Sequence, residues 1–162
     1  MHELTKSESE ADLSELAVTY RGVVYPWQCD HIGHMNVMWY VGKFDEATWH
    51  LFALMGITPT YMRDQKRGMA AVEQTITYKR ELRAGDVIAI RSGLLEMKER
   101  VIRFHHEMWN EETGDVVATT ILTGVHMDTK GRKSCPFPPE ILERGRKMVG
   151  EHGLNGFRAT ST

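Results

Sequence analysis

The order of apolar and polar positions predicts one long helix early in the chain, followed by a series of strands. Residues 37–55 place apolar side chains at steps of three and four, which is the spacing of one helix face. Asn36 before this segment is a suitable N-cap, and Gly56 after it is a suitable C-terminal stop. Trp39 and Trp49 widen the apolar stripe, so we expect the helix to be enclosed on most of its sides.

Five other segments have the composition of strands, because they alternate in polarity or are rich in β-branched and aromatic residues. Alternation places Val72 and Ile76 on one face of the second segment, and Phe104 and His106 on one face of the fourth. The five segments are residues 18–26, 69–82, 87–97, 101–110 and 116–127.

The remaining segments complete an α+β arrangement. Residues 61–68 indicate a basic linker, and residues 140–149 indicate a short exposed helix. An antiparallel sheet of about five strands wrapped around one long central helix would bury every apolar face at once. Residues 18–149 are therefore expected to form one domain, between an acidic disordered tail at 1–17 and a second disordered tail at 150–162.

Composition narrows the class of protein. A hydrophobic content of 41% and a charged content of 26% are ordinary for a globular domain, and a net charge of −2 argues against general nucleic-acid binding. The chain starts without the pattern of a signal peptide and contains no apolar run of the roughly 20 residues that span a membrane. Cys29 and Cys135 lie far apart without a partner motif, which indicates a reduced, cytoplasmic protein.

Reactive side chains are concentrated in residues 27–36, directly before the predicted helix. Asp30 lies beside apolar residues, which would raise the pKa of its carboxyl group and suit it to act as a base or nucleophile. It also precedes a helix start, whose free backbone N–H groups can polarise a carbonyl. This pairing is typical of acyl transfer. The alternative is that Asp30 only caps a turn.

The neighbouring histidines and cysteine have simpler interpretations. His31 and His34 have an H-x-x-H spacing, but zinc would need a third ligand such as His50, and no standard ligand pattern is present. We therefore expect no metal. Cys29 beside a histidine could be a nucleophile, but a small buried apolar residue is the commoner role. Cys29 and His31 are assigned structural roles.

A run of residues at this point resembles the 4-hydroxybenzoyl-CoA thioesterase-like family of hotdog-fold acyl-CoA thioesterases. The similarity covers about residues 18–142 and implies the hotdog fold. It also implies hydrolysis of a small or medium acyl-CoA thioester to the free acid and CoA, and it allows an aryl or betaine-like acyl group. The residues that carry it are Asp30, Gly33, His34, Asn36, Tyr40, Phe44, Asp45, Glu46 and Ala47, with a weaker similarity at Tyr78, Leu82, Gly85 and Asp86.

The resemblance implies a role for each residue of the turn. Asp30 would be the catalytic carboxylate, which either attacks the thioester or activates a water. Val37 would polarise the thioester carbonyl through its backbone N–H, although it stands where a second asparagine is frequent in the family. Gly33 would allow the carbonyl to approach closely, and His34 and Asn36 would form a supporting H-x-N element.

Other residues are assigned to substrate binding. Trp27 and Tyr40 would contact the acyl group, and Lys98 and Arg100 would bind the phosphates of CoA. Asp45 matches the carboxylate of a second class of hotdog thioesterase, but the HGG turn of that class is missing, so Asp45 ranks below Asp30. The aromatic residues expected around an aryl or quaternary ammonium acyl group are Trp27, Trp39, Tyr40, Trp49 and Tyr61.

The resemblance further implies a homodimer whose sheets pair edge to edge with the sites at the interface, and it allows a dimer of dimers. No cofactor is expected, because CoA enters as part of the substrate, and neither a nucleic acid nor a membrane is an expected partner. Two alternatives remain open: a hotdog dehydratase or hydratase with a histidine base, and a non-catalytic acyl-CoA or acyl-carrier binding module.

Overall fold

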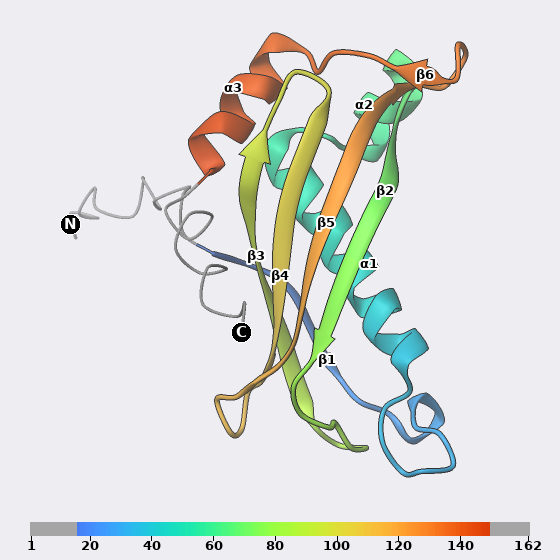
Figure 1. Cartoon of the computed structure of the whole chain (residues 1–162), viewed down its shortest axis with the longest axis vertical. Helices are drawn as coiled ribbons and strands as arrows, with labels where there is room; N and C mark the ends of the chain where they lie inside the picture. The colour runs from blue at the N-terminus through green and yellow to red at the C-terminus, as the bar shows by residue number, and fades with distance from the viewer. Residues whose placement is uncertain (1–15, 150–162) are drawn as a thin grey trace, which may run out of the picture.

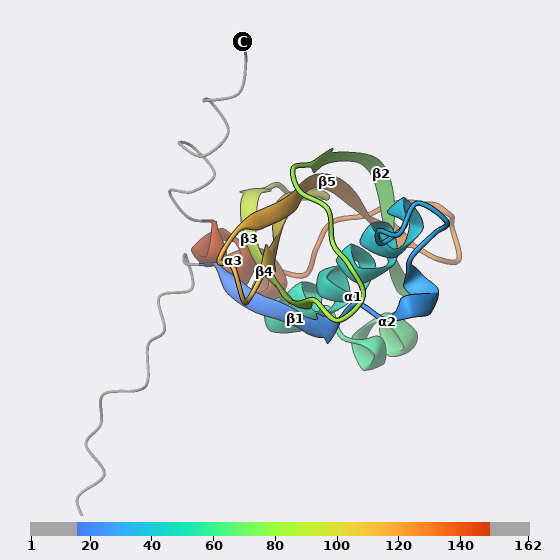
Figure 2. The ribbon, with the colours of Figure 1, turned by 90° about the horizontal axis from the view of Figure 1, so that it is seen from below.

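The long helix α1 (Val37–Met55) lies in the hollow of a curled antiparallel sheet (Figures 1 and 2). The structure is a computed structural model that describes residues 16–149. The strand order is β1-β3-β4-β5-β2, and a two-residue strand β6 pairs with β5. The bounds are β1 Ala17–Val23, β2 Arg67–Tyr78, β3 Val87–Met97, β4 Val101–Asn110, β5 Val116–Asp128 and β6 Lys133–Ser134.

This arrangement confirms the predicted α+β class. Strand β1 begins one residue earlier than expected, at Ala17. Residues 1–15 and 150–162 of the two predicted tails lie outside the described residues. In the part of the chain that the structure describes, no helix is both long and apolar enough to cross a bilayer.

Helix α1 has the predicted ends. The Asn36 side chain accepts a hydrogen bond from the Met38 N–H, and Gly56 ends the helix with a φ of 94°, a conformation that favours glycine. The expectation that α1 is enclosed on most sides is wrong for the single chain. One side packs into the sheet, but Val41 and Trp49 on the other are exposed.

The strand β4 confirms the predicted alternation, whereas β2 departs from it. Phe104 and His106 are both buried on the concave side of the sheet. In β2 the register shifts between Ala71 and Glu73, so Val72 is the extra residue of a bulge and is 61% exposed. The predicted common face of Val72 and Ile76 is therefore interrupted.

Two short helices correct the expectations for the connecting segments. The predicted linker at 61–68 overlaps α2 (Pro59–Gln65), which is capped by the Thr58 side chain accepting from the Tyr61 N–H. Helix α3 (Pro139–Met148) is amphipathic, and its buried residues, including Ile141, pack on the core formed with the end of α1. It covers one end of the sheet (Figure 1).

A chain of buried polar groups crosses the core from β1 to α1. Thr48 Oγ1 donates to the Phe44 carbonyl at 2.9 Å, so it accepts the 2.8 Å bond from His106 Nε2. His106 Nδ1 is then the acceptor for the Ser92 hydroxyl, and Ser92 Oγ accepts from Thr19 Oγ1 at 2.6 Å, a closer acceptor for Thr19 than the Ile90 carbonyl at 3.3 Å. Burial lowers the pKa of His106 to about 3, so this histidine stays neutral.

Candidate active site

The segment before α1 is an ordered loop that is held against the turn after β2. The Met35 N–H donates to the Leu82 carbonyl at 2.8 Å, and the Asn36 N–H donates to the Gln28 carbonyl at 2.8 Å. Gly33 has a φ of 96°, which explains glycine at this position of the turn. These bonds place Asp30 beside the first turn of α1.

The Asp30 carboxylate has two defined donors. Its Oδ2 accepts from Asn36 Nδ2 at 3.1 Å, and its Oδ1 accepts from the Ile32 N–H at 2.9 Å. These bonds hold the pKa of Asp30 below its ordinary value, with the Asn36 bond as the larger cause. The expectation of a raised pKa is therefore wrong, because the loop leaves Asp30 only partly buried and the hydrogen bonds outweigh burial.

The first turn of α1 offers a backbone donor next to this carboxylate. The Met38 N–H is taken by the Asn36 side chain, and the Trp39 N–H donates to the Asn36 carbonyl at 3.0 Å. Among the described residues the Val37 N–H has no acceptor. The first N–H groups of a helix have no partner within the helix, so this one is left for a ligand or a water. A partial positive charge is therefore directed outward there.

Asp30 and Val37 line the same cavity, of about 340 Å³, which we call the Asp30 hollow. Tyr40 forms part of its wall. The lining residues are Asp30, Ile32, His34, Met35, Val37 and Tyr40 from the loop and helix, with Tyr78, Lys79, Arg80 and Glu81 from the end of β2 and the turn that follows.

His34 joins the two sides of the hollow. Its Nε2 lies 2.9 Å from Glu81 Oε2, so the loop before α1 and the turn after β2 are paired across the rim. Sequence reasoning missed Glu81. The signal available was its position between Tyr78 and Leu82, two residues that belong to the weaker part of the resemblance.

Not all the predicted substrate-binding residues meet here. Trp27 stacks on Tyr25 at 4.5 Å and is 68% exposed, and it is absent from the lining of the hollow. Of the five aromatic residues expected around the acyl group, only Tyr40 lines the hollow. Tyr61 lies at the other end of α1, where its hydroxyl bonds to His126 Nε2 at 2.8 Å. The predicted aromatic cluster is therefore wrong as a group.

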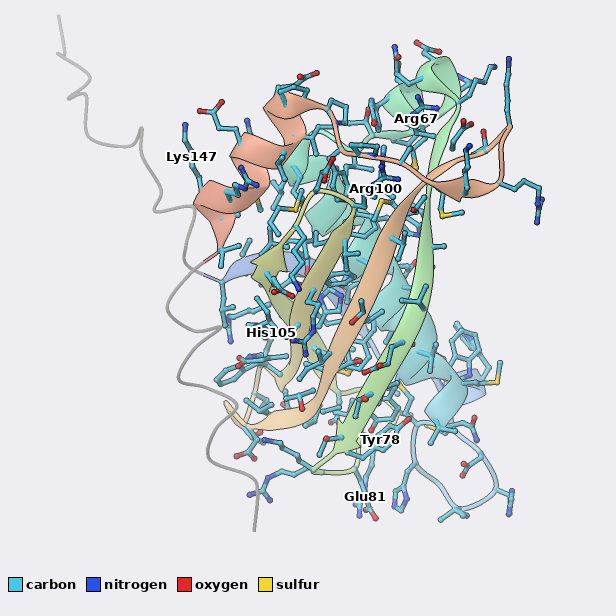
Figure 3. All side chains as sticks on the ribbon, turned by 45° about the horizontal axis from the view of Figure 1, so that its top comes forward. Arg67, Tyr78, Glu81, Arg100, His105 and Lys147 are labelled. Atoms are coloured by element: carbon cyan, nitrogen blue, oxygen red, sulfur yellow. The ribbon has the colours of Figure 1, made fainter. Side chains whose placement is uncertain are left out.

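The predicted phosphate-binding residues lie far from Asp30 on the same chain. Figure 3 shows Arg100 at the opposite end of the sheet from Tyr78 and Glu81. Arg100 donates to the Ser134 carbonyl at 2.9 Å, and Lys98 on the same turn pairs with Glu96 at 3.1 Å. Two other cations, Lys79 and Arg80, line the hollow itself.

The residues ranked below Asp30 lie outside the hollow. Asp45 is on the exposed side of α1 and accepts from Trp49 Nε1 at 3.3 Å. Cys29 forms a backbone bridge with Met35, and His31 is exposed. Among residues 16–149 no three histidine, cysteine or carboxylate side chains are grouped as metal ligands.

A larger groove of about 770 Å³ runs between β1 and α1, along Glu46, Trp49 and His50. It contains neither Asp30 nor the start of α1. A carboxylate beside an unused helix N–H is the arrangement that acyl transfer requires, so the smaller Asp30 hollow is the candidate active site.

Three comparisons identify the family. The sequence pattern of the thioesterase-like superfamily matches residues 24–145. The betainyl-CoA thioesterase of Pseudomonas aeruginosa is 24% identical, over 86% of this chain and 88% of that protein. The L-carnitine dehydrogenase/betainyl-CoA thioesterase of Agrobacterium fabrum is 30% identical over 80% of this chain, which spans only 28% of that longer protein.

The fold also has solved counterparts. A Staphylococcus aureus protein, solved in complex with CoA, superposes with a TM-score of 0.79 at 18% identity, over 84% of this chain and 85% of that one. The hotdog fold and the thioesterase class expected from the sequence are thus confirmed. The superfamily match extends from the end of β1 into α3 and includes every residue of the Asp30 hollow. This chain belongs to the thioesterase-like superfamily.

Proposed function

We propose that this protein hydrolyses a small acyl-CoA thioester, with Asp30 as the catalytic carboxylate and the Val37 N–H as the donor to the thioester carbonyl. The observation that carries the proposal is that the carboxylate and the free helix N–H line one hollow. A carbonyl seated there has a negative oxygen in front of its carbon and a helix N-terminus at its oxygen.

The lowered pKa of Asp30 supports an ionised carboxylate at neutral pH. In one route the Asp30 carboxylate attacks the carbonyl carbon and releases the CoA thiolate. This leaves an acyl anhydride that water hydrolyses. The carboxylate can equally take a proton from a water that attacks the same carbon, with CoA again as the leaving group. In both routes the charge that develops on the carbonyl oxygen is stabilised by the Val37 N–H, while Asn36 holds the carboxylate in place.

The proposed acyl group is betaine-like, with a quaternary ammonium next to the thioester. Both curated relatives carry betainyl-CoA thioesterase in their names. The hollow supports a small acyl group of this kind, because its volume is about 340 Å³ and its wall combines the ring of Tyr40 with the carboxylate of Asp30.

We also propose that the working unit is at least a homodimer formed through β2. This strand of 12 residues is at one edge of the sheet, and most of its side chains from Ala71 to Tyr78 are exposed in the single chain. A long uncovered edge is a template for pairing with another strand. A second copy of β2, running antiparallel, would supply that partner.

Such pairing would explain why the predicted phosphate-binding residues Lys98 and Arg100 lie far from Asp30 on the same chain. Two antiparallel β2 strands bring the Arg67 end of one copy to the Tyr78 end of the other. The turn with Lys98 and Arg100 lies at the Arg67 end, so the second copy would carry it toward the first copy's Asp30 hollow. There it would meet the CoA phosphates. The free thiols of Cys29 and Cys135 accord with a reducing compartment, and we propose a cytoplasmic location.

The test is hydrolysis of betainyl-CoA, followed by trapping of the released thiol, in the wild type and in Asp30→Asn. Asp30→Asn should lower kcat by about three orders of magnitude, the scale of losing a catalytic group, while CoA affinity persists. Asp45→Asn is the matched control and should keep its activity. Retained turnover in Asp30→Asn would contradict the mechanism, and CoA binding without thioester hydrolysis in the wild type would indicate a binding module.

A further inference from the structure

We propose that the ring of Tyr78 and the carboxylate of Glu81, backed by Tyr40, form the recognition site for the quaternary ammonium of the acyl group. This inference rests on the proposed function, because it concerns the acyl part of the same thioester. It assigns substrate choice to the end of β2 and the turn that follows, which line the same hollow as Asp30.

The covalent structure of the acyl group limits where its cation can bind. In a betainyl thioester the ammonium nitrogen is two single bonds from the carbonyl carbon, a separation of about 2.5 Å. A carbonyl held between Asp30 and the Val37 N–H therefore places the ammonium inside the same hollow. Tyr78 and Glu81, with Lys79 and Arg80 between them in the chain, also line that hollow.

The aromatic side of the site is already in position. The rings of Tyr40 and Tyr78 meet edge to face, with centroids 5.2 Å apart and an angle of 87°. Tyr40 is buried, whereas Tyr78 is 48% exposed, so Tyr40 supports a ring that still has surface for a ligand. A quaternary ammonium has no N–H to donate, and aromatic faces are the groups that bind it through its charge.

The carboxylate side is held by His34, which pairs with Glu81 Oε2 at 2.9 Å and orients the group across the rim. The charge of Glu81 is felt inside the hollow. Burial is the main cause that raises the pKa of Tyr40 to about 12, and the negative charge of Glu81 adds to the shift. A negative potential that disfavours a tyrosinate at this place favours a bound cation.

Positive groups also line the hollow, so the balance of charge decides the preference. Arg80 is paired with Asp115, at 3.5 Å. Lys79 then stands against the two carboxylates of Asp30 and Glu81. The balance favours a cationic acyl group over a neutral one of the same shape.

The experiment compares kcat/KM for betainyl-CoA with kcat/KM for 3,3-dimethylbutanoyl-CoA, in which a carbon replaces the ammonium nitrogen. The wild type should prefer the cationic thioester about tenfold or more, and added salt should reduce this ratio. Glu81→Gln keeps a hydrogen-bond acceptor for His34 but removes the charge, and it should lower the ratio about three- to tenfold. Tyr78→Leu should lower it similarly, whereas Tyr78→Phe keeps the ring and should keep the preference.

Glu112→Gln, in the turn between β4 and β5, is the matched control and should leave the ratio unchanged. Thermal unfolding of each variant separates a change of recognition from a loss of fold. Equal kcat/KM for both thioesters in the wild type, or an unchanged ratio in folded Glu81→Gln and Tyr78→Leu, would overturn this inference and leave the thioesterase proposal intact. Hydrolysis of neither thioester, nor of other small acyl-CoAs, would overturn both.

Discussion

Asn36 joins the Asp30 carboxylate to the start of helix α1 through the two ends of one side-chain amide. Its Nδ2 donates to Asp30 Oδ2 at 3.1 Å, and its Oδ1 accepts from the Met38 N–H at 3.1 Å. The group that caps the helix is therefore the group that orients the proposed catalytic carboxylate. Position and charge of Asp30 depend on the same residue.

Asn36→Ala should affect stability and catalysis together. Loss of the cap should reduce the free energy of unfolding by about 1 kcal/mol. Because the pKa of Asp30 is lowered in the folded protein, its ionised carboxylate stabilises the fold at pH values above the unfolded pKa of 3.8. This contribution is lost as the pH falls through the folded pKa. Without Asn36 that pKa rises toward 3.8, so the acid limb of the kcat/KM profile should move to higher pH.

Thr58→Ala is the control for this prediction, since Thr58 caps α2 in the same way but lies at the other end of α1. Urea unfolding should show a similar loss of stability, with an unchanged pH profile. An acid limb that stays in place in Asn36→Ala would show that Asn36 does not set the charge of Asp30.

Gly33→Ala should strain the turn that presents Asp30. An added Cβ meets no atom within 4 Å, so the cost comes from the φ of 96° and should be about 1–2 kcal/mol in unfolding free energy. Gly114→Ala is the matched variant, because Gly114 also has a positive φ and open space but lies in the turn between β4 and β5. Both should lose stability, and only Gly33→Ala should lose kcat.

His106→Gln should change how stability depends on pH. The unfolded histidine titrates near its ordinary 6.5, and the folded one at about 3, so the wild type is stabilised above 6.5 and loses that contribution as pH falls toward 3. Between pH 7 and pH 5 the loss from this residue should be about 2 kcal/mol. Urea unfolding at the two pH values should show a smaller difference in the variant, and an equal difference would mean that His106 is charged in the folded protein.

Val72→Lys should weaken the proposed dimer, since it adds a charge to the uncovered part of β2, which would face its own copy. Sedimentation should move toward the monomer mass, and activity should become dependent on protein concentration. Val87→Lys is the control, because Val87 is also exposed but begins β3. A wild type that sediments as a monomer while it is fully active would contradict the dimer.

The fold was predictable where short-range signals agree. The ends of α1 follow from two local signals. The side chain of Asn36 caps the first turn, and the backbone freedom of Gly56 allows the conformation that ends the last turn. Strands β3 and β4 match their predicted ranges, because charged turns separate two apolar runs. Helix α2 was missed because Arg63 and Asp64 dominate a segment of seven residues, although Thr58 and Pro59 carried its start signal.

The site was predictable only in its local part. Asp30, Asn36 and Val37 are close in sequence, and the structure places them together. Glu81 was missed, because its contact with His34 depends on how β2 ends beside the loop. The pKa of Asp30 was given the wrong direction because apolar neighbours in sequence do not report the donors that a folded turn supplies. Roles for all these residues stay predictions that the variants above test.

The one-way run of hydrogen bonds from Thr19 through Ser92 and His106 to Thr48 has a consequence for how this lineage can diverge. The hydroxyls of Thr19 and Ser92 each direct their single proton at the next member, and the Thr48 hydroxyl donates to the Phe44 carbonyl, so replacing one residue by an apolar one strands the neighbour's polar atom in the core. A sequence that carries only part of this set of residues should lose folding stability. Descendants of this sequence should either retain the whole set or replace it in concert, and few should carry part of it.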